Sequence, residues 1–266
     1  MRQSDLVNPM INSTMKAKIK SVFTATIVCA FWIVLWEIIA VLYDNEIILP
    51  TFHSTFIALL SSIWDKDFLL VIAFSLLRVL LGFLIGSSVA IILAVISAKF
   101  EPLKTLFAPI MTVAKSAPVV AIIIIIWLLV GQQSVPIAIS ALMVMPIVWQ
   151  NVIDGYEAID IGLMEVCSVY GFSFKKRFCH LYLPTLAKFL FPGLITSSGL
   201  AFKAGIAAEI ICMTKNSIGK EIYDAKALDD SPTKFAWVVL VILLSLALEL
   251  AIKHAIRRIG KKWHLN

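Results

Sequence analysis

Residues 165–184, EVCSVYGFSFKKRFCHLYLP, form a polar segment between two long apolar stretches. Three adjacent basic residues occupy positions 175–177, and the segment ends in Leu-Pro. Gly171 follows apolar side chains that recur at helical spacing, and glycine is a common residue just past the end of a helix. The pattern predicts a helix, a glycine turn and a second helix, with Pro184 at the entry to the next apolar stretch. A simple connector would need none of these features, so we expect a rigid docking element.

The composition indicates an integral membrane protein. Of the 266 residues, 60% are hydrophobic and 15% are charged, whereas soluble domains have about 25% charged residues. A membrane-spanning helix needs about 20 mainly apolar residues. Stretches of this kind cover residues 21–43, 69–96, 105–131, 135–153, 186–213 and 235–256. We therefore expect an all-α integral membrane protein with about six transmembrane helices, in which residues 1–266 form a single domain.

Two local features qualify these spans. Pro118 lies inside the third stretch and can break it, because proline cannot continue the hydrogen bonding of a helix. Gly82 and Gly86 in the second stretch form a G-x-x-x-G pair, which lets helices approach closely. We expect this pair to pack within the subunit, with dimerisation as the second interpretation.

The distribution of Lys and Arg predicts the orientation, because basic residues concentrate in cytoplasmic loops. With the N-terminus inside, the cytoplasmic side carries Arg2, Lys16, Lys18, Lys20, Lys99, Lys104, Lys175, Lys176, Arg177, Lys188, Lys253, Arg257, Arg258, Lys261 and Lys262. The outer side carries only Lys66, Lys215, Lys220, Lys226 and Lys234. We therefore expect a cytoplasmic segment at 1–20, a cytoplasmic loop at 155–185 and a cytoplasmic tail at 257–266. The net charge of +6 then reflects topology rather than nucleic-acid binding.

Arg78, Lys115, Lys203 and Glu209 fall inside the expected spans, where charged side chains usually face protein or water. Arg78 and Glu209 lie near the outer ends of the second and fifth spans, at comparable depths. We predict an ion pair between them with a structural or gating role, the alternative being that each is satisfied separately. Lys115 and Lys203 have no carboxylate partner in the spans. They either line a path for an anion or reach helix carbonyls and the membrane surface.

The 165–184 segment resembles the EAA loop of ABC importer permeases. That loop reads E-A-A, three residues, G, nine residues, I-x-L-P, and it precedes the penultimate span, as here. The pattern falls on Glu165, Val166, Cys167, Gly171, Leu181, Leu183 and Pro184. In this chain Val and Cys stand in place of the two alanines and Leu stands in place of the isoleucine, so the positions remain small or apolar.

Other stretches are similar to the nitrate/sulfonate/taurine/bicarbonate branch of these permeases. They include ILPTFHSTFIALLSSI (48–63), SLLRVLLGFLIG (75–86) and FAPIMTVAKSAPVVAIIIIIWL (107–128). The resemblance implies a type I ABC importer permease with the MetI-like fold. It implies that Glu165, Val166, Cys167, Gly171, Leu183 and Pro184 couple the chain to an ATPase.

The resemblance also implies partners. These are a dimer of ABC ATPase subunits that hold ATP and Mg²⁺, a second permease copy in a homodimer, and an extracytoplasmic substrate-binding protein. The location would be a bacterial-type cytoplasmic membrane. We expect a small anionic solute as cargo, such as a sulfonate, nitrate or taurine. A thiamine-precursor-like or other organic solute is the alternative.

Two other classes remain as alternatives, an ion-coupled secondary transporter and an intramembrane enzyme. A secondary transporter needs carboxylates in the spans, for which Glu37, Glu209 and Glu249 are candidates. The chain has no HExxH or GxSxG motif, and its four cysteines lack metal-ligand spacing. It also lacks a G-x-x-x-x-G-K-[ST] phosphate loop, so we expect no cofactor in this chain and ATP hydrolysis in a separate subunit.

Overall fold

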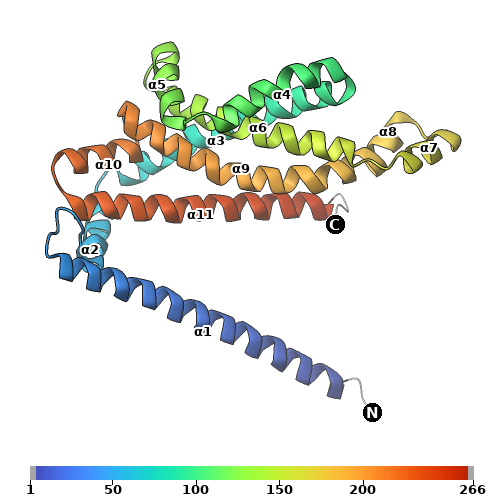
Figure 1. Cartoon of the computed structure of the whole chain (residues 1–266). Helices are drawn as coiled ribbons and strands as arrows, with labels where there is room; N and C mark the ends of the chain where they lie inside the picture. Colours follow the sequence, from blue (N-terminus) through green and yellow to red (C-terminus); the bar gives the residue numbers. More distant parts are fainter. Residues whose placement is uncertain (1–3, 263–266) are drawn as a thin grey trace.

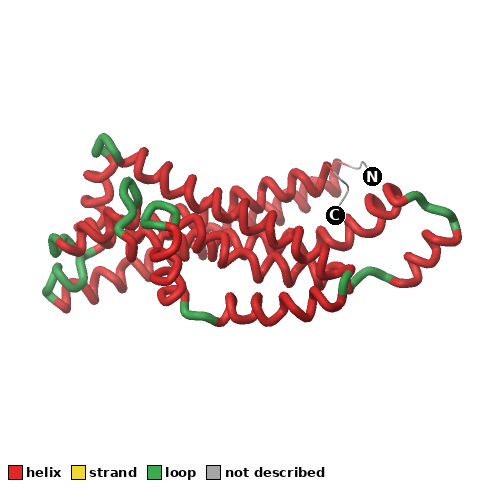
Figure 2. Tube along the Cα trace, turned by 90° about the horizontal axis from the view of Figure 1, so that it is seen from above, coloured by secondary structure: helices red, strands yellow, loops and turns green. Residues whose placement is uncertain are grey.

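The computed structural model describes residues 4–262 and the side chains of residues 23–260, and this part of the chain is helical without any strand. The helices are α1 (Ser4–Tyr43), α2 (Phe52–Ile63), α3 (Phe68–Lys99), α4 (Glu101–Ser116), α5 (Val119–Val130), α6 (Val135–Glu157), α7 (Ile161–Val169), α8 (Phe174–Arg177), α9 (Leu183–Cys212), α10 (Ile218–Ala227) and α11 (Ser231–Lys262). A π-helical turn, η1 (Phe178–Tyr182), joins α8 to α9. The long helices run side by side, with short loops at their ends (Figures 1 and 2).

Five described segments are long and apolar enough to cross a membrane, within α1, α3, α6, α8–α9 and α11. A sixth span forms if α4 and α5 are taken together, although the two helices are bent by 108°. Ala117 and Pro118 adopt extended backbone conformations between them, because the residue before proline avoids the helical region. The stretch expected over 105–131 is therefore interrupted, and the break lies at Pro118, where the sequence predicted that it could occur.

The core forms where α6 packs between α3 and α9. A methyl group added to Gly86 would lie 2.4 Å from the carbonyl oxygen of Ala141, and one added to Gly82 would lie 2.4 Å from that of Ile137. Only glycine permits this approach, so the G-x-x-x-G pair packs within the subunit, as predicted. Apolar residues of α3, α6 and α9, including Val79, Val148 and Phe202, fill the remaining space.

Helix α1 is attached to the rest of the chain mainly at one end. The Trp36 indole N–H donates to the carbonyl oxygen of Pro50 at 3.0 Å, and Glu37 accepts the N–H of Phe52 at 2.7 Å. Further from this end, Phe23, Phe31 and other large apolar side chains are exposed. Figure 1 shows α1 diverging from the body of the molecule. The expected 1–20 segment is largely the first part of this helix; residues 1–3, like 263–266 of the expected tail, lie outside the described residues.

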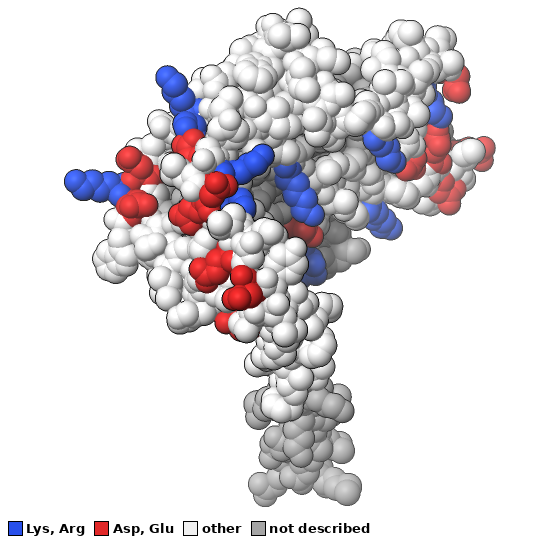
Figure 3. Space-filling model, turned by 60° about the vertical axis from the view of Figure 1, so that its left-hand side comes forward, with Lys and Arg blue, Asp and Glu red and all other residues white. Residues whose placement is uncertain are grey.

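The two ends of the bundle carry different connections. The beginning of α1, the end of α11 and the α7–α8 region lie toward one end in Figure 1, and α2 and α10 lie at the opposite end. This is the arrangement expected if the first end is cytoplasmic. Figure 3 brings the α2–α10 end forward and shows Lys, Arg, Asp and Glu gathered there, with a second charged group at the right edge of the view and wide uncharged areas between them.

Candidate functional site

The 155–185 loop begins with a short helix, α7, whose start is fixed by a cap. The Asp160 carboxylate accepts the backbone N–H of Gly162 at 2.7 Å and that of Leu163 at 3.3 Å. A side chain in this position satisfies N–H groups that have no partner inside the helix. Glu165, with its neighbours at 166 and 167, lies in the middle of α7, where the cap helps to hold the helix without support from a core.

Gly171 ends α7 in a left-handed conformation, with φ of +62°. Its N–H donates to the carbonyl oxygen of Ser168 at 3.1 Å, and the N–H of Phe172 donates to that of Cys167 at 2.9 Å. This pair of hydrogen bonds is a Schellman motif, which favours glycine at its left-handed position. The predicted glycine turn is therefore present, and the requirement at Gly171 is conformational, since no atom lies within 4 Å of an added methyl group.

Arg177 connects the two limbs of the loop. Its Nε donates to the carbonyl oxygen of Phe172 at 3.1 Å, and its Nη2 lies 3.5 Å from that of Cys167. The second contact reaches a carbonyl near the end of α7, where cations interact favourably with the helix dipole. Sequence reasoning gave the basic run only a topological role, whereas in the structure Arg177 fastens α8 to α7.

The second helix of the loop does not stop before the membrane helix. Residues Phe174–Cys212 form one helical segment of 39 residues that includes α8, η1 and α9. Pro184 lies in the first turn of α9, directly after the π-helical turn. Proline has no N–H to donate to the preceding turn, so the helix accommodates it there rather than ending. Pro184 therefore lies at the start of α9, as predicted, while the short helix before it continues into α9 through η1.

The surface of α7 has no partner within the described chain. No α7 residue is buried. The exposed fraction is 49% for Val166 and 84% for Val169, and Leu163 and Met164 are also exposed. Figure 1 shows α7 beyond the ends of the long helices. A short helix that is capped at both ends and presents apolar side chains away from its own core has the form of a docking element.

A second group of polar residues joins α3, α9 and α10 at the opposite end. Glu209 of α9 has a fully buried side chain, and Arg78 of α3 is 13% exposed. Arg78 Nη1 lies 3.4 Å from Glu209 Oε1, so the two side chains that the sequence paired are in contact. The closer partner of Glu209 is Ser75, whose hydroxyl donates to Oε2 at 2.8 Å. Gly219 N also donates to Oε2, at 3.3 Å.

Arg78 also holds the α9–α10 loop. Its Nη2 donates to the carbonyl oxygen of Lys215 at 2.9 Å, and its Nη1 to that of Asn216 at 3.1 Å. Met213 and Asn216 in this loop both have positive φ, near 50°, a conformation that is unfavourable for residues other than glycine. The guanidinium therefore stabilises a strained loop in addition to the buried carboxylate.

The connection between α5 and α6 is fastened to the same end. Gln132 Nε2 donates to the carbonyl oxygens of Cys212 at 2.6 Å and Met213 at 2.7 Å. Gln133 Oε1 accepts from Arg78 Nη2 at 3.3 Å. We call Ser75, Arg78, Gln132, Gln133, Glu209 and the backbone of 213–219 the outer polar cluster. It links the broken span to both α3 and α9.

The two intramembrane lysines remain exposed in the isolated chain and have no hydrogen-bond partner among the described residues. Lys115 lies in the last turn of α4, just before the bend. Lys203 precedes Ala204, which shares an apolar cluster with Val119 at the start of α5. Both lysine side chains are exposed rather than buried in the core.

Sequence reasoning missed several members of these sites. Ser75 lies three residues before Arg78, and that helical spacing was an available signal. Gly219 gave no local signal, because its role is the close approach of α10 to α9, where an added methyl group would lie 2.3 Å from Glu209 Cβ. Glu37, considered as an ion-coupling carboxylate, instead accepts the N–H at the start of α2. No group of three or more His, Cys, Asp or Glu residues with metal-site geometry occurs in the described part of the chain.

Comparison with known proteins identifies related chains. The family described as "Binding-protein-dependent transport system inner membrane component" matches residues 86–261, which is more than half of the chain. A Methanocaldococcus jannaschii protein named as an ABC transporter permease is 23% identical over 236 residues, covering 85% of this chain and 86% of its own length. A Bacillus subtilis protein named as an aliphatic sulfonates transport permease, SsuC, is 22% identical over 211 residues, covering 78% of this chain and 76% of its own.

Proposed function

The chain belongs to the binding-protein-dependent inner membrane components, the permeases of ABC transporters, and we propose that it carries a small anionic solute inward across a bacterial-type cytoplasmic membrane. Membership establishes a multi-pass permease subunit that is not itself an enzyme, with ATP hydrolysis in a separate subunit. The family also implies an ATPase partner. The identity of the cargo, the cytoplasmic termini and the remaining partners belong to the proposal.

The observation that carries the proposal is the exposed α7 helix. A capped helix that has no buried residue and presents exposed apolar side chains on a polar loop is unfavourable unless a partner covers it. In an ABC permease the partner that must deliver mechanical work to the chain is the ATPase. We therefore assign the docking surface to α7 and its glycine turn, with Glu165, Val166 and Cys167 at its centre and Gly171 setting the turn.

The loop is rigid in the way that coupling requires. The Asp160 cap fixes one end of α7, the Schellman motif at Gly171 fixes the other, and Arg177 joins the turn to α8. Closure of two ATP-Mg²⁺-loaded ATPase subunits would move this unit as a body. The membrane helices would follow in a hinge or shear transition between inward and outward access.

The anionic cargo is supported by the two exposed lysines. Lys115, just before the bend, and Lys203 of α9 are exposed without a carboxylate partner among the described residues, and an unpaired cation in a span normally faces water or a ligand. A second copy of the chain in a homodimer would double this positive lining. The similarity to a protein named for aliphatic sulfonate transport agrees with such a cargo. A substrate-binding protein on the outer side would deliver it.

A pull-down of tagged chain from its native membrane tests the assignment. We expect an ABC ATPase and an outer binding protein to co-purify, and ligand screening of that binding protein to yield a small sulfonate or similar oxoanion. Glu165→Lys and Gly171→Asp should leave the chain inserted and abolish ATP-dependent uptake. Normal uptake by both variants would refute the docking role of α7.

A separate measurement of ATP-dependent uptake tests the two lysines. Lys115→Gln and Lys203→Gln should lower the uptake of the anion while ATPase association is unchanged. Lys188→Gln, an exposed lysine outside the proposed path, is the matched control. Equal uptake by all three variants would remove the positive lining from the proposal.

A further inference from the structure

A cavity of about 180 Å³ lies where α3 and α6 end and the α8–α9 segment begins. Its lining is almost entirely apolar or aromatic: Val95, Ala98, Val152, Tyr156, Phe174, Phe178, Tyr182 and Leu186. The one charged lining residue is Lys99, the last residue of α3. Apolar cavities of about 150 Å³ stay dry and accept small hydrocarbon ligands. This cavity is therefore suited to an apolar group rather than to water.

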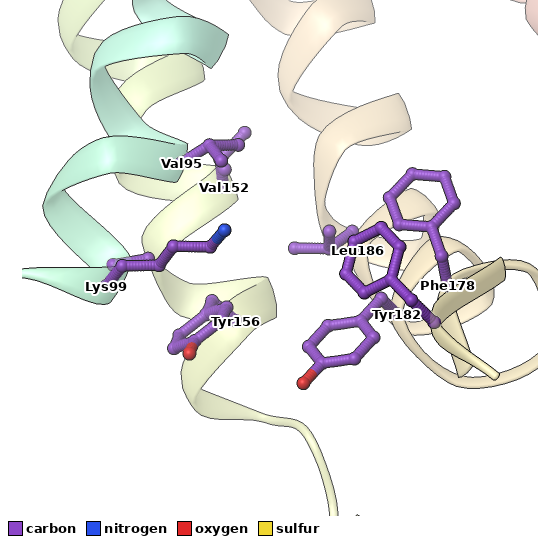
Figure 4. A pocket seen from close by; sticks show the side chains of 9 residues that line it. Val95, Lys99, Val152, Tyr156, Phe178, Tyr182 and Leu186 are labelled. Atoms are coloured by element: carbon purple, nitrogen blue, oxygen red, sulfur yellow. The ribbon is translucent and has the colours of Figure 1, made fainter. Parts of the chain in front are cut away.

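The Lys99 ammonium has no partner within the described part of the chain, where no hydrogen bond or ion pair involves it. Figure 4 shows its side chain extending from α3 toward Tyr182 and Leu186, across the space between the two walls. Tyr156 and Tyr182 lie on opposite walls with their rings stacked 6.4 Å apart. A ligand for this site needs an apolar body and a negative group that reaches Lys99.

The surroundings indicate where such a ligand comes from. Above the cavity, α3 presents Ile92, Val95 and Ile96, which are 59%, 41% and 39% exposed, as an apolar surface. The tyrosines and the lysine lie at the ends of spans, the level at which aromatic and basic residues mark a membrane interface. Lys175 lies next to Phe174 of the lining and adds positive charge. A dissolved anion would make no use of the exposed apolar surface that continues along α3, whereas an acyl chain would.

We propose that this cavity binds an anionic phospholipid of the cytoplasmic leaflet, with its phosphate at Lys99 and part of one acyl chain in the apolar space. The remainder of the acyl chain lies along the exposed face of α3. Basic pockets between transmembrane helices on the cytoplasmic side are known to recognise anionic head groups. Here the charge, the apolar volume and the membrane level coincide at one place.

The position of the cavity gives the lipid a role. One wall belongs to α3 and α6, and the other is Phe174, Phe178, Tyr182 and Leu186 on the limb that leads from the 155–185 loop into the membrane. A lipid between these walls would stabilise one position of that limb. This regulatory consequence rests on the proposed function, whereas lipid binding itself does not depend on it.

The test counts lipids bound to the purified full-length chain. Nanodiscs with equal amounts of phosphatidylglycerol and phosphatidylcholine are disrupted, and bound lipid is measured by native mass spectrometry. We expect phosphatidylglycerol to be retained in preference to phosphatidylcholine. Lys99→Gln should weaken that retention about five-fold, since one basic side chain near an anionic surface is worth ~1 kcal/mol. Lys99→Arg should preserve it.

Two further variants separate charge from shape. Val95→Phe narrows the cavity and leaves the lysine in place, so it should also weaken the retention of the lipid. Lys188→Gln removes one exposed lysine from α9 outside the lining and should have no effect. Gel filtration verifies that each variant remains folded.

Three outcomes would overturn the proposal. One is equal retention by Lys99→Gln, Val95→Phe and wild type. Another is equal retention of the two phospholipids. The third is occupation of the site by an added alkylsulfonate under conditions in which no lipid binds, which would assign the cavity to a dissolved anion. Loss of ATPase co-purification with lipid retention intact would contradict the proposed function alone.

Discussion

The buried contact between Arg78 and Glu209 predicts a measurable coupling between α3 and α9. Removing one partner of a buried ion pair typically destabilises a protein by ~3–5 kcal/mol, because the other charge is left without compensation. The two variants should differ here. In Glu209→Ala, Arg78 keeps the carbonyl oxygens of Lys215 and Asn216. In Arg78→Ala, the fully buried carboxylate keeps only the Ser75 hydroxyl and the Gly219 N–H.

The coupling free energy between Arg78 and Glu209 should be smaller than the loss of stability in either single variant. The 3.4 Å separation of Nη1 and Oε1 is long for a charge-assisted hydrogen bond. We therefore expect a coupling energy of ~1–2 kcal/mol, within the range for residues in one hydrogen-bond network. The assay is a double-mutant cycle with Arg78→Ala, Glu209→Ala and the double variant, unfolded by denaturing detergent and followed by tryptophan fluorescence.

Glu209→Gln is the control for size, because it keeps the side chain volume against Gly219 and an oxygen that can accept from Ser75. It should lose less stability than Glu209→Ala. If the two alanine effects add within ~0.5 kcal/mol, the residues act independently. The residues of the outer polar cluster would then stabilise the chain independently of one another, and the predicted coupling between α3 and α9 would be refuted.

Three further results are expected. Gly86→Leu should prevent α3 from packing on α6 and destabilise the chain by more than ~3 kcal/mol, measured in the same unfolding assay. Burial and the nearby Asp224 raise the pKa of the Glu221 carboxyl. The folded state therefore binds more protons than the unfolded state, and the free energy of unfolding falls as the pH rises above 4.5. Glu221→Gln should flatten this pH dependence. Arg177→Ala should reduce ATP-driven uptake more than Lys175→Ala, whereas equal losses would indicate simple charge anchoring.

The membrane helices could be predicted because they depend on local composition. Apolar length alone places α3, α6, α9 and α11 within a few residues of the expected spans. The bend at Pro118 was also foreseeable, since proline and the residue before it restrict the backbone locally. Its size of 108° was not, because the angle depends on how α5 packs against α6 and α9.

The candidate sites likewise contain residues that local sequence could predict and residues whose role depends on the packing of distant segments. Gly171 followed from the sequence because the end of a helix needs a left-handed residue, and that requirement is local. Arg78 and Glu209 were found together because uncompensated charges in spans are rare, which leaves few possible partners. The role of Arg177 depends on the direction in which the chain leaves the turn. The Lys99 cavity is formed by three helices that are distant in sequence, so no local sequence pattern could predict it.

The continuity of α8, η1 and α9 connects the two candidate sites mechanically. The 39-residue segment Phe174–Cys212 would be about 58 Å long at 1.5 Å per residue. It begins at the turn that Arg177 fastens to α7 and carries Glu209 near its other end. Had a flexible joint separated the loop from the span, motion at the proposed docking surface would be lost at that joint. Because the helix instead continues through Pro184, under the proposed function a displacement of α7 would be carried along this one helical segment toward the outer polar cluster.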